Sequence, residues 1–306
     1  MVEKYAKNTP KKVWKERNMA YNGEVITSAQ NKYVSLARLL YERKQRQKSS
    51  LYRFDGVKLL CEALTNGVEL EFLLICESSY GAVSEKMWTL YSIALEKLEC
   101  RVIIVSDSLF AKISEENAPE GIVAVAKYDG KRHREICAAE ITVKDGENVL
   151  LLESVRDPQN VGAILRTAAA FSVDRVIMSR DCADIYNSKT LRASMGAVFA
   201  LRIDRVDSIP DAVSVMRGCG RRVFAAAIDK SAVRLGVAEF SSGDCVVIGN
   251  EGHGLSEETV KVCDASVYIP MSSVVESLNA AVAAAVIMWE FFGHDNSMGG
   301  RYEARG

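Results

Sequence analysis

The sequence contains no long hydrophobic run, which argues against a membrane-spanning helix. Such a helix needs about 20 mostly apolar residues, and the longest apolar stretch, AAVAAAVIMWEFF at 280–292, is shorter and contains Glu290. The N-terminal segment also lacks the apolar core of a secretory signal. Hydrophobic residues make up 48% of the 306 residues and charged residues 26%. We therefore expect a soluble globular protein with a substantial core.

Histidine is scarce and the cysteines are scattered, so the sequence does not favour a metal site. The chain has 3 histidines and 8 cysteines, and no two cysteines form a C-x-x-C pair. His133, His253 and His294 cannot be assigned to a Ser-His-Asp or Cys-His catalytic arrangement either. We expect no metal, and free thiols in a reducing cytoplasm.

Two common nucleotide-binding fingerprints are also absent. GNEGHG at 249–254 places its glycines as G-x-x-G-x-G rather than G-x-G-x-x-G, and there is no G-x-x-x-x-G-K-[ST] loop. These absences argue against a nucleotide-dependent oxidoreductase on an ordinary doubly wound sheet and against a nucleoside triphosphate site.

Basic charge is concentrated near the N-terminus, although the whole chain has a net charge of only −1. Residues 1–55 hold 13 Lys and Arg against 5 Asp and Glu, and the remainder holds 26 against 35. This asymmetry suggests a basic arm that binds a polyanion. Charge alone fits a solubilising tail equally well.

The basic region includes a predicted helix at 28–48, with Ser28 as its N-cap. The last turns of this helix are strongly basic, which suits the helix dipole and would also suit the phosphates of a nucleic acid. As a hypothesis, we assign phosphate contacts to the basic residues clustered there: Lys44, Arg46, Lys48 and Arg53.

The rest of the chain alternates between apolar runs and helical patterns, which predicts two α/β domains. Strands are expected in the first domain at 70–76, 101–105 and 121–126, with helices at 57–66, 84–98 and 107–113. Strands are expected in the second domain at 148–153, 175–179, 200–204, 222–227, 245–249 and 266–270, with a final helix at about 277–292.

The strands of the second domain are continuously apolar, which indicates a parallel sheet covered by helices on both faces. The predicted division of the chain is a basic extension at 1–27, a small α/β domain at 28–128, a linker at 129–146, the second α/β domain at 147–294 and a tail at 295–306.

Three unusual stretches follow strands of the second domain. They are SVRDPQNVGAILRTAAAF at 154–171, GNEGHGLSEE at 249–258 and IPMSSVVESLNAAVAAAVIMWE at 269–290. In an open α/β sheet, ligands bind beyond the carboxyl ends of the strands. We therefore expect these loops to converge on one edge of the sheet and to form a site there.

These stretches resemble a known family. N-V-G-A-I-L-R-T-A (160–168), I-G-N-E-G-H-G-L (248–255), and I-P-M with E-S-L-N-A-A-V-A-A-A-V (269–286) are similar to the three motifs of the SpoU/TrmH family of the SPOUT superfamily. Members of that family are RNA ribose 2′-O-methyltransferases. The resemblance covers roughly residues 148–292, and segments 28–64 and 121–125 are similar to the RNA substrate-binding domain of many members.

The resemblance implies a fold and a cofactor that periodicity alone would not predict. The second domain would be an α/β fold tied in a trefoil knot near its C-terminus, with S-adenosylmethionine bound in the knot. The protein would be a homodimer with each active site near the subunit interface. The separate first domain and the basic arm favour ribosomal RNA over transfer RNA as the substrate.

The resemblance assigns the central role to Arg166, which would contact the phosphate and ribose of the target nucleotide. A guanidinium group binds phosphate bidentately. Its proposed second role, as the base that takes the hydroxyl proton, stays a hypothesis, because arginine loses its proton only above about pH 12. The alternative is an ion pair within the domain.

Two further polar residues belong to this set. Asn160 can cap the helix that it begins, bind the substrate, or do both. Glu251 is expected to be a buried carboxylate that pairs with Arg166 or Asn160 and fixes its orientation. The alternative for Glu251 is a negative charge beside a helix N-terminus.

The resemblance also implies which residues hold the cofactor. Backbone groups of Gly249, Ile269 and Leu278 would bind it, and Met271 would line the same pocket. Ser277 and Asn279 would bond to the target nucleotide or to the cofactor, although Ser277 alone would read as an ordinary helix-start residue. Many members have Val-Ser where this chain has Ala280 and Ala281, so a hydroxyl role at 281 is absent.

Two alternative functions remain open at this point. One is methylation of transfer RNA by the same chemistry. The other is a non-catalytic RNA-binding or ribosome-assembly factor on the same fold, although such a factor would not need the full set of polar motif residues.

Overall fold

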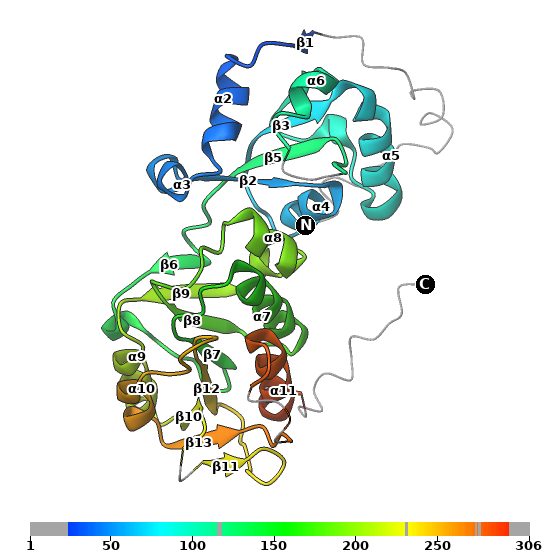
Figure 1. Ribbon diagram of the computed structural model, residues 1–306. Helices are drawn as coiled ribbons and strands as arrows, with labels where there is room; N and C mark the ends of the chain where they lie inside the picture. The colour runs from blue at the N-terminus through cyan, green and yellow to red at the C-terminus, as the bar shows by residue number, and fades with distance from the viewer. Residues whose placement is uncertain (1–23, 115–117, 230–231, 273, 275–276, 294–306) are drawn as a thin grey trace. The chain divides into compact units, whose positions relative to one another are not determined.

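The computed structural model describes residues 24–114, 118–229, 232–272, 274 and 277–293 (Figure 1). The chain folds into two compact units, and each is described by itself. Unit 1 comprises Met1–Asp129 together with Tyr186–Phe199, and unit 2 comprises Gly130–Ile185 together with Ala200–Gly306. The segment Tyr186–Phe199 therefore packs with the N-terminal unit, whereas the sequence placed it in the second domain. The expectations for residues 1–23 and 294–306 lie outside the described residues.

Unit 1 is built on a five-stranded sheet in the order β1-β4-β3-β5-β2. Strands β1, β3 and β4 run parallel, and β5 is antiparallel to both β3 and β2. The three predicted strands are present, and the sequence missed β1 and β2. The strands are β1 (Val25–Ile26), β2 (Leu51–Asp55), β3 (Leu70–Cys76), β4 (Arg101–Val105) and β5 (Ile122–Lys127).

The helices of unit 1 differ from prediction at two places. The single helix predicted at 28–48 is two helices, α2 and α3, and Asn31 rather than Ser28 caps α2 by accepting a hydrogen bond from the Tyr33 N–H at 3.0 Å. The helix predicted at 84–98 is α5 followed by a separate 3₁₀ turn. The helices are α2 (Lys32–Leu39), α3 (Arg43–Ser49), α4 (Val57–Thr65), α5 (Tyr80–Tyr91), α6 (Asp107–Phe110) and α8 (Ser188–Ser194), with 3₁₀ turns at Glu77–Ser79, Leu95–Lys97 and Ala197–Phe199.

Unit 2 contains an eight-stranded sheet in which every described pairing is parallel, as predicted. The strand order is β11-β13-β10-β12-β7-β8-β9-β6. All six predicted strands are present. The strands are β6 (His133–Glu135), β7 (Val149–Leu152), β8 (Arg175–Ser179), β9 (Arg202–Val206), β10 (Val223–Ala226), β11 (Val233–Arg234), β12 (Cys245–Ile248) and β13 (Ala265–Tyr268).

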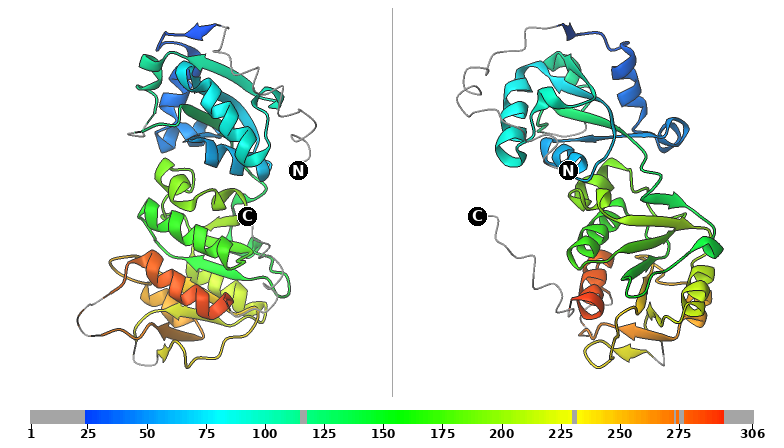
Figure 2. Two further views of the ribbon diagram at one scale, coloured as in Figure 1. Left: turned by 90° about the vertical axis from the view of Figure 1, so that its right-hand side faces the viewer. Right: turned by 180° about the vertical axis from the view of Figure 1, so that it is seen from behind.

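Helices cover both faces of this sheet (Figures 1 and 2). Helices α7 (Pro158–Ala170) and α11 (Ala280–Phe292) lie side by side on one face, and α9 (Ile209–Gly218) and α10 (Glu257–Val262) lie on the other. The four residues of β7 are therefore completely buried. No helix among the described residues is long and apolar enough to cross a membrane.

The predicted linker at 129–146 is wrong in part, because it contributes the edge strand β6 and a 3₁₀ turn, Ala138–Glu140, to unit 2. Its polar composition hides this role. Strand β6 is held by charge: Arg134 Nε and Nη2 donate to the two carboxylate oxygens of Asp204 on β9, at 2.7 and 3.1 Å.

Asp204 is the centre of a buried ionic network. It is fully buried, and so is Arg175 on β8, whose Nε donates to Asp204 Oδ2 at 2.5 Å. Arg175 Nη1 also donates to the Thr142 carbonyl at 2.6 Å. Burial lowers the pKa of Arg175, and the charge of Asp204 opposes that shift. Buried charges of this kind are tolerated only when paired.

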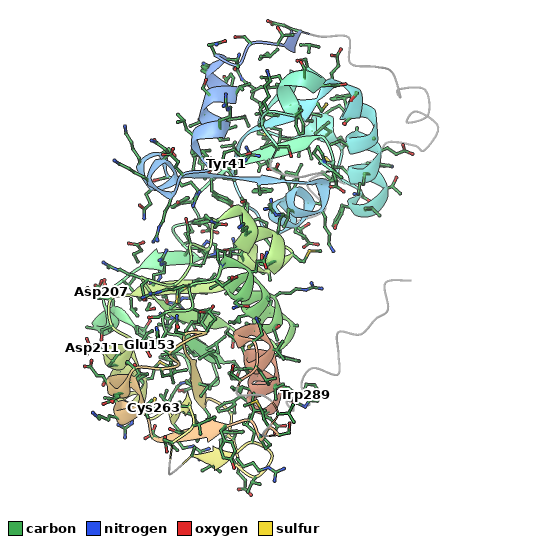
Figure 3. The ribbon with its side chains drawn as sticks, viewed as in Figure 1. Tyr41, Glu153, Asp207, Asp211, Cys263 and Trp289 are labelled. Atoms are coloured by element: carbon green, nitrogen blue, oxygen red, sulfur yellow. The ribbon has the colours of Figure 1, made fainter. Side chains whose placement is uncertain are left out.

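We expect Asp204→Asn to destabilise unit 2 strongly, because it leaves the buried Arg175 without its counter-charge. Breaking a buried pair in this way costs about 3–5 kcal/mol, measurable as a fall in the free energy of unfolding in urea. The matched control is Asp207→Asn, which removes an exposed carboxylate (labelled in Figure 3) that pairs with Arg180 at 2.8 Å and should change stability far less. Equal effects of the two substitutions would contradict the role given to the network.

Candidate active site

A hydrogen-bonded relay joins the three loops that the sequence analysis placed at the carboxyl edge of the sheet in unit 2. Asn160 lies in the first turn of α7, after β7. Its Nδ2 donates to Glu251 Oε1 at 3.0 Å, and its Oδ1 accepts from Asn279 Nδ2 at 2.9 Å. Glu251 follows β12, and Asn279 is the N-cap of α11. Residues from distant parts of the chain are thus brought together as predicted.

Asn160 does not cap α7, which corrects one of its expected roles. The cap is Asp157, whose Oδ1 accepts from the N–H groups of Gln159 and Asn160 at 2.6 and 3.1 Å. Pro158 occupies the first helical position, where its missing N–H costs nothing. Because Asp157 serves the helix, the Asn160 side chain is free to enter the relay. Aspartate followed by proline was the sequence signal for this cap.

Glu251 fixes the turn before α7 as well as Asn160. Its carboxylate accepts from the Asp157 N–H at 3.2 Å and from the Arg156 N–H at 3.4 Å. Glu251 is exposed rather than buried, which corrects the expectation. Partial desolvation acts to raise its pKa, but the hydrogen bonds from Asn160 and from backbone N–H groups outweigh it and hold the pKa below its ordinary value. The carboxylate is therefore ionised at neutral pH.

The loop after β12 folds back tightly on itself. Asn250 and Gly254 pair across it, and a Cβ built on Gly249 would lie 2.4 Å from the Gly254 carbonyl carbon. Only glycine fits such a close backbone approach. Asn250, which the sequence analysis overlooked, donates to the Ser154 carbonyl at 2.7 Å and accepts from the Gly252 N–H at 2.8 Å. This side chain connects the loop after β12 to the loop after β7.

A pocket of about 730 Å³ lies beside the relay. All four residues predicted to hold a cofactor line it, as does Ser277: Gly249, Ile269, Met271, Leu278 and Ser277. Its wall also includes Ala226, Ile248, Leu255, Val267, Ala283 and Ile287. Polar and charged side chains line it too: Asp229, Asn250, Glu251, His253, Glu257 and Lys261. A mainly apolar concavity that also contains polar groups is typical of a small-molecule site.

Arg166 is exposed on α7 and makes no hydrogen bond or ion pair with any residue that the structure describes. Neither the predicted pair with Glu251 nor the alternative ion pair within the domain is observed. The cation is therefore available to a ligand from outside this chain.

Two of the four residues predicted to contact phosphate are buried rather than exposed at a helix end. Arg46 is only 3% exposed, and its Nη1 donates to the carbonyls of Leu40 and Tyr41 at 2.9 and 2.6 Å. Arg53 is 2% exposed and pairs with Asp55, with 2.5 Å between Nη2 and Oδ1. Their guanidinium groups organise unit 1 instead of lying on its surface. Lys44 and Lys48 are exposed on α3.

Metal ligands are not grouped anywhere in the described ranges, where no three His, Cys, Asp or Glu side chains lie together in a suitable cluster. The polar groups of the relay are amides and one carboxylate, Arg166 adds a guanidinium, and the pocket wall adds the side chains of Asp229, His253, Glu257, Lys261, Tyr268 and Ser277. Such groups can hold and orient an organic ligand and a phosphate.

Comparison with known proteins matches both parts of the chain. The SpoU rRNA Methylase family matches residues 147–289, and the MRM3-like substrate binding domain matches residues 31–124. The 23S rRNA (guanosine(2553)-2'-O)-methyltransferase RlmP of Bacillus subtilis is 28% identical over 88% of this chain and 99% of its own length.

Two further relatives extend the comparison. A Staphylococcus aureus protein named as a TrmH family tRNA/rRNA methyltransferase is 32% identical over 60% of this chain and 74% of its own length. The crystal structure of an AdoMet-bound rRNA methyltransferase from Sinorhizobium meliloti superposes with a TM-score of 0.72 at 27% identity, over 87% of this chain and 96% of that one. Together with the motifs around the relay, these matches show that the chain belongs to the SpoU/TrmH family of RNA methyltransferases.

Proposed function

We propose that this protein transfers the methyl group of S-adenosylmethionine to the 2′-oxygen of a ribose in ribosomal RNA. The observation that carries the proposal is the Asn160–Glu251–Asn279 relay at the rim of the 730 Å³ pocket. The similarity to the 23S rRNA methyltransferase RlmP and to the AdoMet-bound rRNA methyltransferase supports the choice of substrate and cofactor.

The pocket has the chemistry that S-adenosylmethionine requires. Its volume lies within the range of about 300–1,000 Å³ that is usual for small-molecule sites. Ile248, Ile269 and Leu278 offer apolar contacts for an adenine ring, and the backbone at Gly249 carries no side chain that would obstruct access. The cofactor, when bound, supplies an electrophilic methyl group.

The remaining residues would position the ribose. Arg166 carries an exposed guanidinium that can hold the phosphate of the target nucleotide bidentately and so orient its 2′-hydroxyl. Glu251 is occupied by four hydrogen bonds, from Asn160, Asn250 and two backbone N–H groups, so its role is to hold Asn160 and the turn before α7. Ser277 at the pocket wall can donate to the nucleotide or to the cofactor.

The same proposal includes a homodimer and a knot near the C-terminus. Val282, Val286 and Trp289 form an exposed apolar stripe on α11, with 51%, 39% and 49% of their surfaces accessible. The Trp289 ring (labelled in Figure 3) also packs edge-on against the Phe171 ring, with 5.8 Å between the ring centroids. A second copy would cover this stripe. Light scattering that gives the mass of one chain at micromolar concentration would overturn the dimer.

Gly249→Ala should weaken cofactor binding. The added methyl group would meet backbone atoms of Gly254 and Leu255 at 2.4–2.6 Å, so the loop that lines the pocket must move. Overpacking of this kind costs about 1–3 kcal/mol. If the whole cost falls on the bound state, the affinity for S-adenosylmethionine in isothermal titration calorimetry falls about fivefold to about 150-fold. Gly252→Ala is the matched control, since its nearest neighbour would be Asn250 Oδ1 at 3.6 Å. Similar losses in both variants would refute the explanation.

Arg166→Ala tests the proposed reaction itself. Methyl transfer from labelled S-adenosylmethionine is measured with unmodified ribosomal RNA and transfer RNA pools. We expect label in ribosomal RNA that makes one dinucleotide resistant to alkali, and a fall in rate of about 100-fold or more in the variant, because positioning is lost. Cofactor affinity should be unchanged, since Arg166 does not line the pocket.

The other outcomes of this experiment separate the alternatives. Label in transfer RNA alone would identify a transfer RNA methyltransferase. Tight RNA binding with no label in either pool would indicate a non-catalytic assembly factor. An Arg166→Ala enzyme with the wild-type rate would remove Arg166 from the active site.

A further inference from the structure

A second pocket, of about 400 Å³, lies within unit 1 and has no part in the site described above. Four of its nine lining residues are Lys or Arg and none is Asp or Glu. We call it the basic pocket, and it is lined by Leu40, Tyr41, Arg46, Arg53, Tyr186, Asn187, Ser188, Lys189 and Arg192. The lining points to an anionic ligand.

The wall of the basic pocket that comes from Tyr186–Phe199 is held firmly in unit 1. The Tyr186 ring stacks on Tyr128 with 4.2 Å between centroids, and it lies 4.3 Å from the Tyr52 ring. Its hydroxyl accepts from the Asp129 N–H at 3.1 Å. At the other end of the segment, the Phe199 ring lies 5.4 Å from Phe54. The pocket is therefore formed before a ligand arrives.

Two of the cations are built into the floor of unit 1. Arg46 is held by the carbonyls of Leu40 and Tyr41, as described above, and Arg53 Nη1 donates to the Ile113 carbonyl at 2.8 Å. The Arg53 guanidinium carbon also lies 4.3 Å from the centroid of the Tyr41 ring (labelled in Figure 3). Arg53 Nε is buried and has no hydrogen-bond acceptor in the described structure. Asp55 pairs with Arg53, with 2.5 Å between Nη2 and Oδ1, and neutralises its charge. The lining of the basic pocket still contains Arg46, Lys189 and Arg192 and no carboxylate, which favours an anion.

The other two cations are accessible from solvent. Lys189 is exposed and Arg192 half-buried, both on α8. Ser188 adds a hydroxyl beside them. Two deep cations and two accessible cations suit a phosphate group that enters from solvent, since guanidinium and ammonium groups both bind phosphate oxygens strongly.

We propose that the basic pocket binds a backbone phosphate of the RNA substrate. The proposal rests on the proposed function, which supplies RNA as the polyanion. It explains why a segment inserted between β8 and β9 of unit 2 packs in unit 1, the unit that matches a substrate-binding domain. It also keeps the phosphate role predicted for Arg46 and Arg53 but moves it from a helix end to the floor of a pocket.

The test uses the full-length protein with the paired substitution Lys189→Ala and Arg192→Ala. Its affinity for unmodified ribosomal RNA is measured by filter binding over a range of salt concentrations. Each lost phosphate contact lowers the slope of log K against log salt by about 0.7–0.9. We expect a slope reduced by that amount or more and affinity reduced about tenfold at low salt, with unchanged affinity for S-adenosylmethionine.

The control is the paired substitution Lys58→Ala and Lys112→Ala, which removes the same charge from exposed sites of unit 1 outside the basic pocket. This variant should keep the wild-type slope. If Arg192→Ala impairs folding, Lys189→Glu alone changes an exposed side chain and should give the same direction of effect. A wild-type slope in the pocket variants, or equal losses in the control, would overturn the proposal.

Failure of the proposed function would look different. If the wild-type protein binds RNA but transfers no methyl group, the methyltransferase proposal fails. The salt dependence of RNA binding by the pocket variants would still decide whether the basic pocket holds phosphate.

Discussion

The candidate active site depends on the hydrogen bonds that the Glu251 carboxylate accepts. One carboxylate holds the Asn160 side chain and two backbone N–H groups of the turn before α7. Asn160 in turn accepts from Asn279, the residue that begins α11. Three segments of the chain, of which the first lies 91 residues before the second, are thus fixed through one ionised group. The parallel sheet makes this possible, because the ends of β7, β12 and β13 all lie on one edge.

The relay and the pocket have different roles in the candidate active site. The relay consists of polar side chains that satisfy one another, so it defines geometry without needing a ligand. The pocket beside it is mostly apolar and is lined by residues of the loops that the relay joins. Gly249 contributes to the pocket through its backbone, because a Cβ at this position would lie 2.4 Å from the Gly254 carbonyl carbon. Arg166 alone lies outside both arrangements, with its charge directed to nothing in the described chain.

Much of this could be predicted from sequence because the signals were strong and local. The continuously apolar strands predicted the parallel sheet of unit 2. The motif residues that follow three of those strands predicted where the candidate site lies. Strand β6 was missed because its stability comes from Arg134 and Asp204, a pairing across 70 residues that periodicity does not reveal. Arg46 and Arg53 were assigned phosphate contacts because basic residues cluster at the end of the predicted helix, and that pattern does not reveal that both are buried. Here backbone carbonyls and Asp55 compensate their charges inside unit 1.

The packing of Tyr186–Phe199 in unit 1 affects the order in which the chain folds. The rings of Tyr52 and Phe54 find partners in Tyr186 and Phe199, which are synthesised more than 130 residues later. Unit 1 therefore cannot complete its aromatic core while it emerges from the ribosome, and must wait until the first strands of unit 2 have followed. Such long-range closure slows folding. It also means that the first 129 residues are not a transferable module, so recombination between relatives must exchange this short helix together with the N-terminal unit that it completes.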